Sequence, residues 1–117
     1  MKDIEKKITY KDTEYTVVFN LNVMEEIQDK YGSLDAWVAL MDGTAKNGEP
    51  DLKAIIYGYY VMLNEGIEID NEENGKDLKP LTEKQVGRIL TAVGFEDAQK
   101  KLGELMTDST ESNEKNE

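Results

Sequence analysis

The feature that most constrains the fold is an apolar segment near the middle of the chain, at about residues 51–65. Its apolar residues recur at helical spacing; they are Leu52, Ala54, Ile55, Ile56, Tyr57, Tyr59, Tyr60, Val61, Met62 and Leu63. A helix that is apolar nearly all round is usually buried. We therefore expect a central helix that begins near Pro50 and ends at Gly66, with the rest of the chain packed around it. Gly58 in its middle predicts a close crossing with another helix.

Residues 4–19 alternate in the way typical of a β-hairpin. The residues that share the apolar face are Ile4, Ile8 and Tyr10 in the first arm and Tyr15, Val17 and Phe19 in the second. Residues 11–13 are polar and predict the turn. An isolated hairpin is only marginally stable in water, so its apolar face should lie on helices.

Capping signals divide the rest of the chain into further helices. The expected caps are Asn20 or Asn22, Ser33 and Thr82, and the expected stops are Gly32, Asp42-Gly43 and Gly94. Apolar spacing then predicts a last helix from Phe95 to about Met106, whereas residues 67–80 read as acidic and irregular. The predicted fold class is α+β: an N-terminal β-hairpin followed by four to five helices in a single small domain, residues 1–106. Residues 107–117 contain no apolar side chain and predict a disordered acidic-polar tail.

The chain contains neither histidine nor cysteine. Catalytic triads built on these residues are therefore excluded, and so are the two commonest zinc ligands. A Glu, Lys or Tyr acts as an acid or base near pH 7 only where a desolvated cleft shifts its pKa strongly. We expect a protein that is not an enzyme, with no catalytic residue, no cofactor and no metal.

The net charge of the chain narrows the classes of partner that it could bind. Twenty-five acidic and 14 basic residues give a net charge of −11, which disfavours nucleic acid as a partner and favours solubility. No apolar run is long enough to span a membrane, and the first seven residues lack the apolar core of a secretory signal. These features predict a cytoplasmic protein that binds neither nucleic acid nor membrane.

An acidic stretch that begins at Asp70 partly matches a calcium-binding EF-hand loop, with Asp70, Asn74 and Gly75 at positions 1, 5 and 6. Position 12, which should be a bidentate Glu, is Leu81. Pro80 at position 11 also opposes an exiting helix. We interpret the stretch as an acidic surface loop with an Asn-Gly turn, and a calcium-binding module remains a minor alternative.

Four large side chains are candidate partner-binding residues if apolar surface stays exposed: Trp37, Met41, Tyr60 and Met62. Aromatic residues are common anchors of protein interfaces. Each of the four also fits an ordinary core position. The Tyr57-Gly-Tyr-Tyr60 run does not favour base stacking, because stacking platforms lie beside a positive groove and Glu65 and Glu68 are near.

An ordered set of segments resembles the tail assembly chaperones of long-tailed phages and prophages of Gram-positive bacteria. The segments are residues 8–27 with Phe-Asn-Leu-Asn after the second strand, 31–37 with Tyr-Gly-Ser-Leu-Asp-Ala-Trp, 60–67 with Tyr-Val-Met-Leu-Asn-Glu-Gly-Ile, and 81–88 with Leu-Thr-Glu-Lys-Gln-Val-Gly-Arg. The resemblance covers most of residues 4–106.

The resemblance implies a non-enzymatic assembly factor that works in the host bacterial cytoplasm and is absent from the mature virion. Its client would be the tape measure protein, a long helical and apolar chain that it keeps soluble while the tail tube assembles. The tail tube protein and a second copy of the chain are further candidate partners. The alternative function is an acidic protein-binding inhibitor or DNA mimic, which would bind a basic site in a salt-sensitive way.

Overall fold

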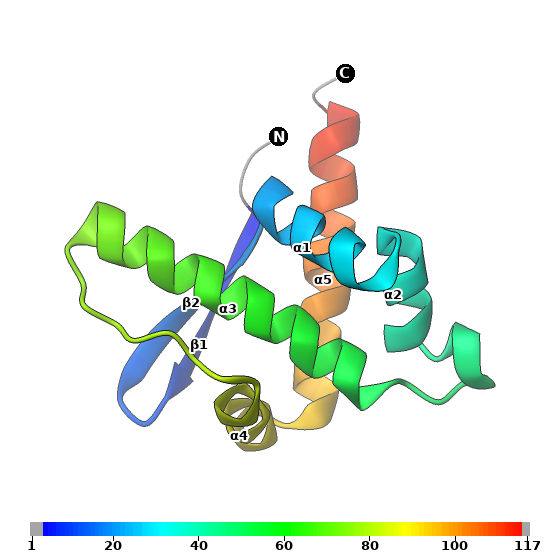
Figure 1. Ribbon diagram of the computed structural model, residues 1–117, viewed down its shortest axis with the longest axis horizontal. Coiled ribbons are helices and arrows are strands. Elements are labelled where there is room, and N and C mark those ends of the chain that lie inside the picture. The colour runs from blue at the N-terminus through cyan, green and yellow to red at the C-terminus, as the bar shows by residue number, and fades with distance from the viewer. Residues whose placement is uncertain (1–3, 116–117) are drawn as a thin grey trace.

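The computed structural model describes the backbone of residues 4–115 and the side chains of residues 5–107. The elements in chain order are β1 (Ile4–Tyr10), β2 (Thr13–Phe19), α1 (Leu21–Tyr31), α2 (Leu34–Met41), the 3₁₀ helix η1 (Thr44–Lys46), α3 (Leu52–Asn74), α4 (Glu83–Val93) and α5 (Phe95–Lys115). The predicted α+β fold is confirmed: an N-terminal hairpin is followed by five α-helices in one small domain (Figure 1).

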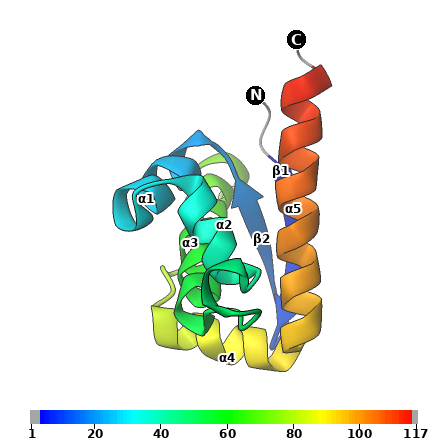
Figure 2. The ribbon, with the colours of Figure 1, turned by 90° about the vertical axis from the view of Figure 1, so that its right-hand side faces the viewer.

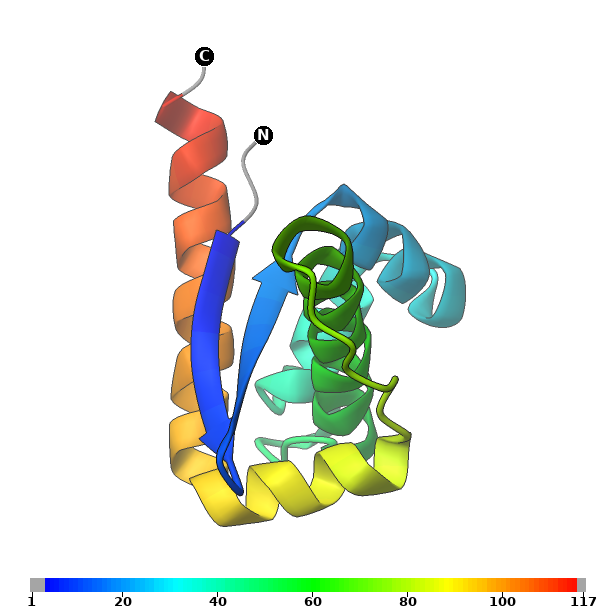
Figure 3. The same ribbon diagram turned by 90° about the vertical axis from the view of Figure 1, so that its left-hand side faces the viewer.

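The hairpin is a two-stranded antiparallel sheet in which Ile8 pairs with Tyr15. Lys11 and Asp12 both have positive φ, at 47° and 66°, so they form a two-residue turn whose twist suits a hairpin. β2 is buried on both faces rather than one, since Thr16 and Val18 are as inaccessible as the predicted core residues beside them. Two helices pack against the hairpin: α3 packs on β2, and α5 runs alongside β1 (Figure 3).

The predicted helix caps are confirmed, with Asn20 rather than Asn22 capping α1. The Asn20 side chain accepts a hydrogen bond from the amide of Val23, and Ser33 likewise caps α2. Thr82 and Gln85 form a complete capping box at the start of α4, where each side chain binds the other residue's backbone amide. Local sequence therefore fixes where these three helices begin.

The central helix differs from its prediction at its C-terminal end. α3 does not stop at Gly66 but continues to Asn74, so the expected irregular structure is wrong for residues 67–74. Gly66 is an interior helix residue, and the helix ends at Gly75, whose φ of 66° is left-handed. Ile67 and Asp70 are both buried, which shows that the added turns are held by tertiary packing.

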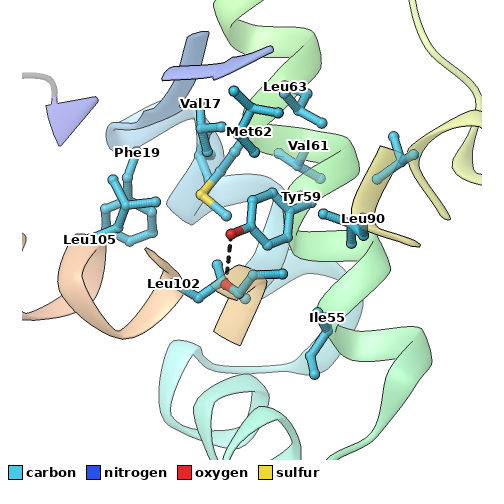
Figure 4. Packing of buried hydrophobic residues seen from close by; sticks show 14 of the residues in the cluster. Val17, Phe19, Ile55, Tyr59, Val61, Met62, Leu63, Leu90, Leu102 and Leu105 are labelled. Carbon is cyan, nitrogen blue, oxygen red and sulfur yellow. Dashed lines mark hydrogen bonds between the residues drawn. The ribbon is translucent and has the colours of Figure 1, made fainter. Parts of the chain in front are cut away.

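The core forms around α3, as predicted (Figure 4). Tyr59 is fully buried, and its hydroxyl donates a 2.7 Å hydrogen bond to the backbone carbonyl of Ala98 in α5. Phe19 of β2 lies beside Leu105 of α5 in the same cluster (Figure 4). One core therefore joins the hairpin, the central helix and the last helix.

The last helix extends beyond the final apolar residue, Met106, to Lys115. It therefore overlaps the tail expected at 107–117, whose disorder stays a prediction; residues 116–117 lie outside the described residues. The first three residues, part of the segment in which no secretory signal was found, lie outside them as well. None of the helices in the described part of the chain combines the length and apolarity needed to cross a bilayer.

Candidate functional site

Three large apolar side chains stay exposed among the described residues: Leu21 at 66%, Leu52 at 59% and Phe95 at 43%. Leu21 stands alone at the first position of α1. Leu52 and Phe95, by contrast, line one pocket, although they are 43 positions apart in the chain. Apolar groups gathered in a concave surface are a stronger sign of binding than a single exposed leucine.

This pocket lies between the first turns of α3 and the helix α4, and we call it the α4 pocket. Its volume is about 320 Å³. Its lining residues are Leu52, Ile55, Ile56, Gly87, Leu90, Thr91 and Phe95. No charged side chain occurs among these residues, so the pocket suits an apolar group.

A second pocket, the α5 pocket, lies between α2, α3 and α5 and has a volume of about 270 Å³. Its lining residues are Val38, Met41, Asp42, Ile55, Gln99, Leu102, Gly103 and Met106. Ile55 lines both pockets, so they adjoin, and we call the pair the apolar groove. Figure 2 looks onto α3 from its N-terminal end and shows α2, α4 and α5 arranged around that end.

Four glycines lie inside helices α3, α4 and α5, and they fall into two pairs. Gly58 and Gly66 are required by packing: a Cβ on Gly58 would overlap the Trp37 indole, and one on Gly66 would overlap the backbone of Thr16. Gly87 and Gly103 are not. A Cβ on Gly87 would lie 3.9 Å from Ile56, and one on Gly103 would meet no atom within 4 Å.

Glycine inside a helix costs about 1 kcal/mol relative to alanine. Packing repays that cost at Gly58 and Gly66 by allowing a close approach. Gly87 lines the α4 pocket and Gly103 lines the α5 pocket. At both positions, the missing side chain leaves space at the wall of a pocket.

Charged residues lie at both ends of the groove. Asp42 lines the α5 pocket and accepts hydrogen bonds from the hydroxyl and, with a smaller effect, the backbone amide of Thr44, which lower the pKa of its carboxyl group. Beyond the α4 pocket is a larger cavity of about 610 Å³ that shares Ile56 with it. Charged side chains of both signs line that cavity: Lys30, Lys53 and Lys84 together with Asp51 and Glu83.

The four candidate partner-binding residues are not brought together. Trp37 and Met62 are fully buried, and the Trp37 ring nitrogen donates a 2.9 Å hydrogen bond to the carbonyl of Ala54. Met41 is 8% exposed and contributes to the wall of the α5 pocket. Tyr60 is half-buried and lines a separate pocket with Glu26, Glu65 and Glu68 among its walls. Their candidacy depended on exposed apolar surface, which Tyr60 retains and which Trp37 and Met62 lack.

Tyr57 of the central helix packs against α1. Tyr57 meets Tyr31 edge to face, with ring centroids 5.8 Å apart, and the ammonium of Lys30 lies 4.2 Å from the Tyr57 ring centroid. Burial, with smaller contributions from nearby acidic and tyrosine groups, raises the pKa of both tyrosines. This arrangement is an aromatic contact between helices and needs no nucleobase to complete it.

Among the described residues, no three His, Cys, Asp or Glu side chains are grouped so that they could hold a metal ion. Residues 70–74, expected as a loop, are helical. The Asp70 carboxylate accepts hydrogen bonds from Thr16 and from Asn74 and lies 3.8 Å from the ammonium of Lys76. Its oxygens are thus turned toward protein donors, not arranged as a calcium loop.

Comparisons with protein-family models, with curated proteins and with solved structures found no match to this chain. The groove is therefore identified from its geometry alone. Sequence reasoning placed Leu52, Phe95 and the residues around them in helices but did not assign them to a site. The available signal was a glycine inside each of two amphipathic helices, at Gly87 and Gly103.

Proposed function

We propose that this chain is a tail assembly chaperone of a long-tailed phage or prophage, with the tape measure protein as its client. The observation that carries the proposal is the apolar groove, where Leu52 and Phe95 stay exposed beside two adjoining pockets. An amphipathic helix binds such a groove with its apolar face. A long helical and apolar client offers many such helices.

The acidity of the chain supports the same role. A net charge of −11 keeps a small protein soluble while it covers apolar client segments. The proposed role uses no catalytic residue, cofactor or metal. It operates in the host bacterial cytoplasm and ends before the virion is mature, and the tail tube protein is a second proposed partner.

Co-expression with the tape measure protein of the phage or prophage that carries this gene tests the proposal. The expected result is that the client moves from the insoluble to the soluble fraction and is retained by the tagged chain. If the client is equally insoluble with and without the chain, the proposed function is wrong. An acidic inhibitor would instead bind a basic protein and release it as salt is raised.

Two matched substitutions test whether the groove carries the binding. Leu52→Gln and Leu21→Gln each replace an exposed leucine at the first position of a helix, but only Leu52 lines the groove. Surface substitutions of this kind change stability by about 0.5 kcal/mol or less. Leu52→Gln is expected to weaken client retention about tenfold, the loss of one well-packed anchor contact, while Leu21→Gln leaves it unchanged.

A further inference from the structure

The hairpin is a sheet of only two strands, so it has two edges at which a strand of another chain could pair. We infer that Lys6, a charged residue on the inward face of β1, prevents the open edge of this sheet from pairing with a second copy of the chain or with another protein. The inference does not depend on the proposed function, because it concerns the hairpin and the helices packed on it.

The register of the hairpin determines which backbone groups face outward from β1. The turn has two residues, so the pair that flanks it, Tyr10 and Thr13, exchanges both ladder hydrogen bonds, and every second pair does the same. The backbone amides and carbonyls of Glu5, Lys7 and Thr9 therefore point away from β2. Within the part of the chain that the structure describes, no residue hydrogen-bonds to these backbone groups. The outer edge of β1 is thus open to an incoming strand.

The opposite edge of the sheet is closed by α3. The same register turns the carbonyl of Thr16 outward from β2, and a Cβ on Gly66 would overlap its oxygen, so the helix backbone lies against this edge. Thr16 and Val18 are both buried. A new strand could reach β2 only by displacing the central helix. Any strand that joins the sheet of the folded chain must therefore pair with β1.

Lys6 interrupts the inward face of β1. Side chains alternate along a strand, so Lys6 shares its face with Ile8 and Tyr10, which lie in the core or pack against it. Its partner in β2 is Val17, which is fully buried. The Lys6 ammonium lies 3.3 Å from the carboxylate of Glu104 in α5, and both side chains remain partly exposed. An apolar residue would suit the packing at this position better, so packing does not explain the lysine.

An added strand would remove water from the Lys6–Glu104 pair. It would lie beside Lys6 and, because α5 runs alongside β1 (Figure 3), close to Glu104 as well. Taking two charges out of water costs more than their attraction returns unless further hydrogen bonds satisfy them. Inward-pointing charges and lysines are common on edge strands for this reason. The ion pair is therefore tolerated while the edge faces water and opposes a strand that covers it.

Replacement of Lys6 by an uncharged, β-branched residue tests the inference. Sedimentation velocity over a series of protein concentrations compares the full wild-type chain with Lys6→Val and with the control Lys79→Val. Lys79 is exposed and lies outside the strands, so the control makes the same change of charge and side chain elsewhere. Lys6→Val is expected to self-associate with a dissociation constant at least about tenfold lower than that of the control. Lys6→Arg keeps the charge and is expected to behave like wild type.

A proline at the open edge tests whether the new association uses β1. The amide of Glu5 faces outward, so Glu5→Pro keeps the ladder between β1 and β2 but removes a donor that an incoming strand needs. Added to Lys6→Val, it is expected to return the dissociation constant to that of Lys79→Val. Thr9→Pro, whose amide also faces outward, gives an independent version of the same test.

Three results would overturn the inference. The first is equal association of Lys6→Val and Lys79→Val. The second is association of Lys6→Val that neither proline weakens, because another surface would then be responsible. The third is association of the wild-type chain that the prolines abolish, because the edge would then be an interface. If circular dichroism shows that Lys6→Val is unfolded, Lys6→Thr and Lys79→Thr make the same comparison. Client retention, which tests the proposed function, is a separate measurement.

Discussion

Gly66 of α3 lies directly against the backbone of Thr16 in β2. A Cβ on Gly66 would lie 2.9 Å from the carbonyl carbon of Thr16 and would overlap its carbonyl oxygen. The central helix and the hairpin therefore meet backbone to backbone at this point. That contact holds α3 against the strand and lets the helix continue for two more turns to Asn74.

We expect Gly66→Ala to destabilise the protein by about 2–3 kcal/mol or more, because the added methyl group meets backbone that cannot move aside. The free energy of urea-induced unfolding measures this directly. Gly103→Ala is the control, since the same substitution in α5 meets no neighbouring atom and is expected to gain about 0.5–1 kcal/mol. Equal effects of the two substitutions would show that the close contact at Thr16 does not exist.

A second close contact, between Gly58 and Trp37, predicts that substitutions at these two positions change the unfolding free energy non-additively. A Cβ on Gly58 would lie 3.1 Å from Cε2 of the indole and would overlap Cζ2. Gly58→Ala alone should cost about 2 kcal/mol or more through this overlap. In a Trp37→Leu background the cost should fall by at least about 1 kcal/mol, because the smaller side chain leaves room for the methyl group. A double-mutant cycle of unfolding free energies gives this coupling, and strict additivity would exclude the overlap.

The prediction of the central helix from sequence succeeded at its start and failed at its end. Its apolar spacing and the Pro50 that precedes it are local properties, so the sequence sufficed there. In the sequence, Gly66 looks like a glycine that ends a helix. In the structure, its contact with β2 keeps it inside the helix, and no local sequence pattern reveals that contact. Asp70 also concealed the extension of the helix. It is buried on the same helix face as Ile67, three positions earlier, where an apolar residue would have continued the helical pattern.

The groove was less predictable than the fold for a related reason. Large apolar residues such as Trp37 and Met62 were the natural candidates for binding. The same residue types are also the ones most often buried, and both lie in the core. What remains at the surface depends on how the helices pack, which brings together Leu52 and Phe95, 43 positions apart in the chain. The glycines that line the pockets carry no side chain, so their role shows only in three dimensions.

Buried Tyr59 predicts a loss of stability at high pH. Burial, and to a smaller extent Glu104, raises the pKa of its phenol above the ordinary value of 10.0. The neutral phenol is therefore favoured in the folded state, and its stabilising effect is complete below pH 10 and is lost as the pH rises beyond that value. The unfolding free energy of the wild-type chain should fall between pH 9 and pH 11, by urea titration.

Tyr59→Phe separates this effect from the other tyrosines with raised pKa values, Tyr31 and Tyr57. At pH 8 the variant should be less stable than wild type by about 1 kcal/mol, because it lacks the hydrogen bond to Ala98. Above pH 10 that difference should shrink, since the variant has no phenol to ionise at this site. A constant difference from pH 8 to pH 11 would contradict the assignment to Tyr59.

The hydroxyl of Thr16 links β1 to the end of α3 and gives the last prediction. It accepts a 2.9 Å hydrogen bond from the ammonium of Lys7 and donates a 3.3 Å hydrogen bond to the buried carboxylate of Asp70. Thr16→Val keeps the shape of the side chain but removes both bonds, and it should cost about 1–3 kcal/mol because a buried carboxylate loses a donor. In an Asp70→Leu background no carboxylate remains, so the same substitution should cost at least about 1 kcal/mol less. Equal costs of Thr16→Val in the two backgrounds, from urea-induced unfolding, would mean that the hydroxyl does not hold α3 to the hairpin through Asp70.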